Sequence, residues 1–68
     1  ELERRVAHLL AVTPGLDAAD VTVTGKGNTI LLAGFVATAA EVARAEEAAR
    51  HVQGVAEVIN RIETVVAR

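Results

Sequence analysis

The fold of this chain is decided by the stretch from Asn28 to Thr38, which reads N-T-I-L-L-A-G-F-V-A-T. Its apolar run is interrupted only by Gly34, and it holds the only aromatic residue of the chain, Phe35. A short apolar run bounded by turn-forming residues is typical of a buried strand. Because side chains alternate along a strand, its residues divide between the two faces of a sheet. One face receives Ile30, Leu32, Gly34 and Val36, and the other receives Leu31, Ala33 and Phe35.

The residues that follow this strand predict a helix. Thr38-Ala-Ala-Glu41 matches a capping box, in which the threonine hydroxyl and the glutamate carboxylate each accept a backbone N–H. The helix should run to about Gln53, with Gly54 as the left-handed residue after its end. Its buried stripe is Val42, Ala45, Ala49 and Val52. Alanines allow a helix to approach a sheet closely, and we expect Gly34 to permit that approach.

The residues before the strand predict a helix and a hairpin. Residues 1–12 carry apolar side chains at helical spacing, and Thr-Pro-Gly at 13–15 ends the helix. The sequence V-T-V-T at 21–24 alternates as a strand does, and G-K-G-N at 25–28 favours a hairpin turn. The apolar helix positions are Leu2, Val6, Leu9 and Leu10.

A third strand is expected from Val55 to about Val66, which gives the order α-β-β-α-β. A right-handed crossover would place this strand parallel to the second, with the first strand antiparallel on the other side. The predicted fold class is therefore α+β, a three-stranded mixed sheet with two helices packed on one face. The opposite face would stay open and would carry Thr22, Thr24, Leu31, Ala33, Phe35, Ile59 and Arg61.

Composition limits the classes of protein to consider. The 68 residues fit a single domain close to the lower size limit for a self-sufficient core, and the chain contains no cysteine. Its net charge of −2 argues against non-specific binding of nucleic acid, and no apolar run approaches the ~20 residues of a membrane span. Because the chain starts at Glu1 rather than methionine, we expect residues 1–68 to be one domain of a longer protein.

The pattern resembles the BON domain, a bacterial module named for osmotic-stress and nodulation proteins. The resemblance covers nearly the whole chain. It is carried by Ile30-x-Leu32-x-Gly34-x-Val36-x-Thr38, by Ala45 and Ala49, and by Val52-x-Gly54-Val55-x-x-Val58-x-Asn60-x-Ile62, with Asp20-Val21-x-Val23 before them.

This resemblance implies the αββαβ fold and a non-enzymatic attachment role. BON domains occur in periplasmic and envelope-associated proteins and are associated with phospholipid binding, while others belong to cytoplasmic proteins with paired regulatory domains. The expected partners are anionic phospholipid, another envelope component or another protein domain. No cofactor and no catalytic residue is implied.

Motifs that could carry other chemistry have simpler explanations. Gly25-Lys26-Gly27 joins two predicted strands, whereas a phosphate-binding loop joins a strand to a helix. His8 and His51 lie on different predicted helices without a third ligand, so we expect no metal site. The chain has no serine, cysteine or tyrosine to act as a nucleophile.

Two surfaces and one polar residue are the candidates for function. An apolar patch of Leu31, Ala33, Phe35 and Ile59, with Arg61, would either bind a partner or be covered by a neighbouring domain. The second predicted helix offers Arg44, Arg50 and His51 to anionic lipid, although Glu46 and Glu47 weaken that case and Glu46 should pair with Arg50. Asn60, on the inner side of the third strand, is expected to bond to loop backbone near Pro14 or the hairpin.

Overall fold

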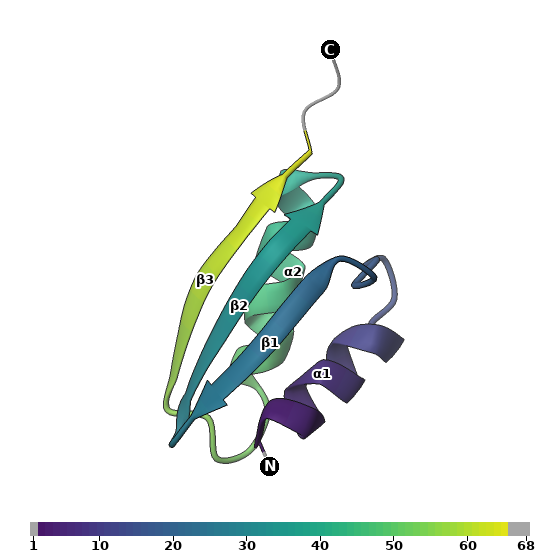
Figure 1. The fold of residues 1–68 in the computed structure, drawn as a ribbon. Coiled ribbons are helices and arrows are strands. Elements are labelled where there is room, and N and C mark those ends of the chain that lie inside the picture. The colour runs from purple at the N-terminus through teal and green to yellow at the C-terminus, as the bar shows by residue number, and fades with distance from the viewer. Residues whose placement is uncertain (1, 66–68) are drawn as a thin grey trace.

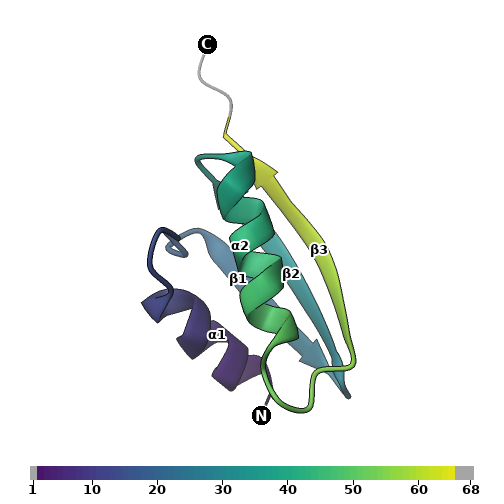
Figure 2. The same ribbon diagram turned by 180° about the vertical axis from the view of Figure 1, so that it is seen from behind.

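The computed structural model describes residues 2–65 and contains two helices and three strands in the order α-β-β-α-β (Figure 1). Both helices lie on the same side of the sheet, which Figure 2 shows from the helical side. The predicted α+β fold is therefore confirmed. The elements are α1 (Leu2–Val12), β1 (Val21–Lys26), β2 (Thr29–Val36), α2 (Ala39–Arg50) and β3 (Glu57–Thr64).

The quoted stretch forms the central strand, because the sheet order is β1-β2-β3. β1 pairs with β2 in antiparallel register from Val21↔Gly34 to Lys26↔Thr29. β3 pairs with β2 in parallel register from Thr29↔Glu57 to Val36↔Thr64. The parallel pair is joined through α2, as a strand–helix–strand crossover requires.

The observed bounds differ from the predicted ones at three places. The hairpin turn contains only Gly27 and Asn28, because β1 continues through Lys26. α2 ends at Arg50 instead of about Gln53, although Gly54 does take the expected positive φ. β3 begins at Glu57 instead of Val55, and the predicted end at Val66 lies outside the described residues.

The core lies between the sheet and the two helices. Its fully buried large side chains are Val6 and Leu10 of α1 and Ile30 and Leu32 of β2. The fully buried residues of α2 are small, Ala45 and Ala49, and its Val42 packs partly buried against the same core. Each buried leucine or isoleucine is worth about 1.5–3 kcal/mol, so a few side chains carry most of the apolar stabilisation.

Gly34 serves a purpose that the sequence did not predict. Its φ is +130°, and a Cβ at this position would lie 1.9 Å from the carbonyl oxygen of Asp20. The contact is made by the backbone before β1, where Asp20 also accepts the Phe35 N–H at 3.2 Å. The glycine therefore permits β1 to begin beside β2, while its expected role in admitting α2 stays a prediction.

The predicted capping box is present and extends further than expected. The Glu41 backbone N–H donates to the Thr38 hydroxyl, and the Glu41 Oε1 accepts the N–H groups of Thr38 and Ala37. Its Oε2 accepts the Asp17 N–H at 3.0 Å, which ties the loop after α1 to α2. This bond from Asp17 lowers the pKa of Glu41 from its ordinary value of 4.5; burial opposes the change, and the bonds from Thr38 and Ala37 reinforce it.

Candidate functional site

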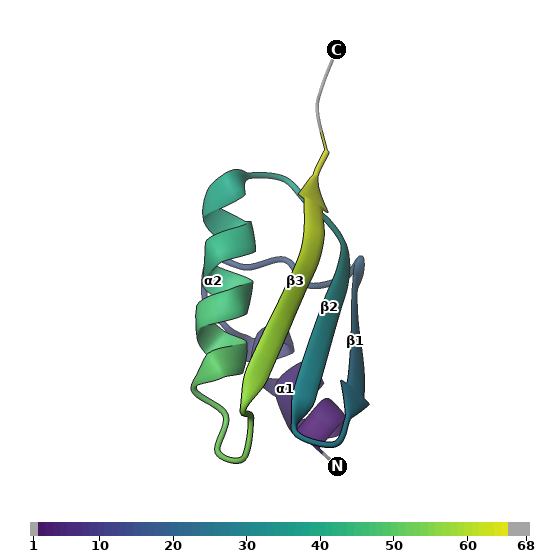
Figure 3. The ribbon, with the colours of Figure 1, turned by 90° about the vertical axis from the view of Figure 1, so that its left-hand side faces the viewer.

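The open face of the sheet has the composition that the sequence predicts. Both helices lie on one side of the strands, and no described element covers the other side (Figure 3). Phe35 is 51% exposed and Ile59 is 39% exposed on this face. The register places Leu31 beside Ile59 and Ala33 beside Arg61. The predicted interaction residues therefore lie together, while their role in binding stays a prediction.

The basic residues predicted to face lipid on α2 all have partners within the domain. Arg44 Nη1 donates to the Gly15 carbonyl at 3.3 Å, which fastens α2 to the loop after α1. Arg50 lies 3.9 Å from Glu47, and His51 Nε2 lies 2.6 Å from the other oxygen of the same carboxylate. The positive charge of this surface is largely offset, because Glu47 lies between its two terminal basic groups.

Glu46 does not pair with Arg50, contrary to the prediction from their spacing. Its carboxylate accepts a hydrogen bond from Asn60 Nδ2 at 3.2 Å instead. The same Nδ2 donates to the Val42 carbonyl, and Asn60 Oδ1 accepts the Ile62 N–H. The predicted partners of Asn60, near Pro14 or the hairpin, are wrong because α2 lies directly over the inner face of β3.

α1 carries a basic surface that the sequence reasoning missed. Arg4, Arg5 and His8 are exposed, and no carboxylate among residues 2–65 lies within 4.0 Å of any of them. Val12, 59% exposed, lies one turn after His8. A signal was present in the sequence, since the apolar stripe of this helix leaves these residues on the opposite side.

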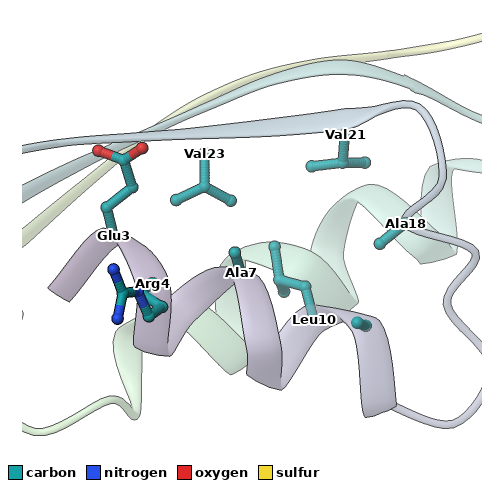
Figure 4. Close-up of a pocket in the computed structure, with 8 residues that line it drawn as sticks. Glu3, Arg4, Ala7, Leu10, Ala18, Val21 and Val23 are labelled. Carbon is teal, nitrogen blue, oxygen red and sulfur yellow. The ribbon is translucent and has the colours of Figure 1, made fainter. Parts of the chain in front are cut away.

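The acidic residue of α1 is directed away from this surface. Glu3 reaches toward β1, where its Oε1 accepts the Gly25 N–H at 3.0 Å (Figure 4). The bond satisfies a backbone group on the outer edge of the sheet. It also leaves the outward side of the described helix with arginine and histidine and no acidic residue.

A groove of about 630 Å³ separates α1 from β1 (Figure 4). Val21 and Val23 of β1 point toward the helix across it, and Ala7 of α1 points back toward the strand. Small side chains keep the groove open, while Glu3 and Arg4 lie at one end. Its lining residues are Glu3, Arg4, Ala7, Leu10, Ala11, Ala18, Val21 and Val23.

Residues 2–65 contain no group of three histidine, cysteine or acidic side chains placed to hold a metal ion. None of the helices in the same range has the length and apolar character needed to cross a membrane.

The fold is that of a small α+β domain with an exposed basic surface on α1 and an exposed apolar patch on the open face of the sheet. The family model of the BON domain matches residues 1–65. The chain therefore belongs to the BON domain family, a family regarded as phospholipid-binding. No curated protein matches the chain.

Proposed function

We propose that this domain is a non-enzymatic attachment module that binds anionic phospholipid through the outward side of α1. The proposal places its parent protein at the bacterial cell envelope, with the periplasm as its compartment. The observation that carries it is the basic surface of Arg4, Arg5 and His8, which forms no ion pair within 4.0 Å with any carboxylate among residues 2–65.

Electrostatics favours α1 over α2 as the lipid-facing helix. A basic residue near an anionic membrane surface contributes about 1 kcal/mol to binding. That contribution requires the charge to be available to the lipid. Among residues 2–65, Arg4 and Arg5 meet this condition, whereas Arg50 and His51 share the carboxylate of Glu47.

Apolar contact at the same surface would strengthen the attachment. Val12 is 59% exposed at the end of α1, and Ala11 is exposed beside it. An amphipathic helix lies in the membrane interface with its apolar residues inserted and its basic residues among the headgroups. The groove between α1 and β1 adds a recess next to Arg4 that an acyl chain could enter.

The experiment compares neutralised variants of the two helices in vesicle co-sedimentation. Arg4→Gln with Arg5→Gln should lower partitioning onto phosphatidylglycerol-containing vesicles roughly 30-fold, because two charges of about 1 kcal/mol each are removed. Arg44→Gln with Arg50→Gln, which makes the same change in net charge, should lower it far less. Binding of the unchanged domain should weaken as salt is added and vanish on pure phosphatidylcholine.

Two results would contradict the proposal. Absence of binding to anionic vesicles at low salt would remove lipid attachment as the function. Loss of binding in the α2 variant, with the α1 variant unaffected, would return the lipid site to Arg44, Arg50 and His51. Circular dichroism of both variants checks that each remains folded.

A second candidate function is docking of another protein domain on the open sheet face, and the exposure of Phe35 favours it. Exposed apolar patches on small domains mark interaction sites. In this case the parent protein would be an assembly or regulatory protein, including a cytoplasmic one with paired regulatory domains. Phe35→Asp in the full-length protein should lower its association state without unfolding the domain. An unchanged mass by light scattering would contradict this candidate.

A further inference from the structure

The outer edge of β3 is not covered by any described element, as Figure 3 shows from that side. The Val65 N–H donates to the Val36 carbonyl at 2.8 Å, and the Glu57 N–H donates to the Asn28 carbonyl. Because the backbone groups of a strand alternate in direction, the odd-numbered residues of β3 bond toward β2. The N–H and C=O groups of Val58, Asn60, Ile62 and Thr64 therefore point away from the sheet.

The side chain of Asn60 occupies one of the outward backbone groups of this edge. Its Oδ1 accepts the outward Ile62 N–H at 3.0 Å, and its Nδ2 is held by α2. The outward N–H groups of Val58 and Asn60 have no acceptor among residues 2–65. An unpaired strand edge is a template for another strand. The available template is thus the first half of β3.

We propose that β3 pairs with the same strand of a second copy of this chain, antiparallel, with Ile59 opposite the partner's Ile59. In this register Val58 lies opposite the partner's Asn60, and each of these residues points its free N–H and C=O outward. The two residues then exchange a pair of hydrogen bonds, and the two-fold axis repeats the exchange. The two three-stranded sheets become one continuous sheet.

Charge complementarity selects this register. It places Glu57 opposite the partner's Arg61, and the two-fold axis makes this pair twice. Sliding by one pairing step in one direction sets Glu57 opposite the partner's Glu63, which is repulsive. Sliding further sets Arg61 opposite the partner's Arg61 and requires the Ile62 N–H, which Asn60 already binds. The four residues that this comparison involves are all exposed on the open face, namely Glu57, Ile59, Arg61 and Glu63.

The pairing also accounts for the apolar residues of the open face near this edge. Leu31 lies beside Ile59 in the register of β2 and β3. Pairing at Ile59 would extend this contact into a strip that runs from Leu31 through both isoleucines to the partner's Leu31. Ile59, now 39% exposed, would be covered on its open side.

A single introduced cysteine tests the register, because the natural chain has none. Residues in a non-hydrogen-bonded antiparallel pair have Cα atoms about 4.5 Å apart, within the range of a disulfide. Ile59→Cys should therefore form a covalent dimer under mild oxidation. Thr22→Cys, exposed on the same face of β1, is the matched control and should stay monomeric. Equal cross-linking of the two variants, or faster cross-linking of Arg61→Cys, would overturn the proposal.

Charge reversal tests the same interface without a covalent bond. Sedimentation equilibrium of the unchanged domain should show a dimer at high concentration, and Arg61→Glu should weaken association about tenfold. Adding Glu57→Arg to that variant should restore association, because the pair is re-formed with its signs exchanged. Glu63→Arg, which lies outside the paired segment, should have little effect. The proposal would be overturned if the unchanged domain is strictly monomeric, or if the double variant associates no more strongly than Arg61→Glu alone. Neither result bears on vesicle binding.

Discussion

α1 and α2 cover the same face of the sheet, but they are held in the fold by different kinds of contact. α1 is attached by large apolar side chains, with Val6 and Leu10 fully buried. α2 buries only alanines deeply and is fastened by polar groups at three places. These are Glu41 on Asp17, Arg44 on Gly15, and Asn60 on Val42 and Glu46.

This difference determines which helix has charges available for a ligand. The polar contacts of α2 engage Glu41, Arg44 and Glu46 within the domain. α1 needs no such contacts on its outward side, because its core stripe provides the attachment. Its arginines can therefore serve binding without cost to the fold, which is the physical basis for assigning lipid attachment to α1.

The largest expected effect comes from removing a core contact of α1. Leu10→Ala should lower the free energy of unfolding by about 2–5 kcal/mol, because it removes a fully buried side chain and leaves a cavity. Val12→Ala, on the exposed side of the same helix, should change it by less than about 0.5 kcal/mol. Urea denaturation measures both. Similar values for the two variants would contradict the apolar attachment of α1.

A smaller effect is expected from removing the polar attachment between α2 and β3. Asn60→Ala should cost about 1–3 kcal/mol, since it removes three part-buried hydrogen bonds, to the Val42 carbonyl, to the Glu46 carboxylate and from the Ile62 N–H. A double-mutant cycle with Glu46→Ala measures how much of that cost belongs to their direct bond. Gln53→Ala, in the exposed turn after α2, is the control. A loss no larger than the control's would show that Asn60 does not contribute to the attachment of α2 to β3.

The third prediction concerns pH, through Glu41. Its folded pKa is lowered, so the ionised carboxylate stabilises the domain above its ordinary value of 4.5, and this stability is lost as the pH falls through the folded pKa. Glu41→Gln should lower the melting temperature at neutral pH, although the amide oxygen can keep part of the bonding. The difference between Glu41→Gln and the unchanged domain should shrink as the pH falls below about 4.5. A difference that stays constant from neutral to acid pH would contradict a charged anchor.

The sequence was sufficient for the fold because its signals are local. The central strand, the capping box at Thr38 and the positive φ at Gly54 each follow from residues close together in the chain. The start of the hairpin turn was predicted less accurately, because glycine at position 25 is typical of a turn. In the structure Gly25 belongs to β1, where its N–H is bound by Glu3 from another element.

The candidate site was harder to predict, because it depends on which charges find partners across the fold. The spacing of Glu46 and Arg50 fits a helix pair, yet Asn60 competes for Glu46 from β3. The need for glycine at position 34 comes from the backbone of Asp20, a neighbour that the sequence did not indicate. These outcomes depend on tertiary contacts between elements, and the periodicity of a single helix carries no information about such contacts.

The smallest expected effect tests why α2 lacks an available basic surface. If Glu47 offsets the charge of Arg50 and holds His51, then Glu47→Gln should free both side chains and raise binding to anionic vesicles a few-fold. Stability should change by less than about 1 kcal/mol, because the pairs are exposed on the surface.

The matched control is Glu63→Gln, which changes the net charge equally but lies on the open face of β3. An increase confined to Glu47→Gln would show that local pairing, rather than overall charge, separates the two helices. Equal increases in both variants would mean that the membrane responds to net charge alone. Local pairing would then no longer explain the difference between α1 and α2. The dependence of binding on Arg4 and Arg5 would still be tested by the Arg4→Gln, Arg5→Gln variant.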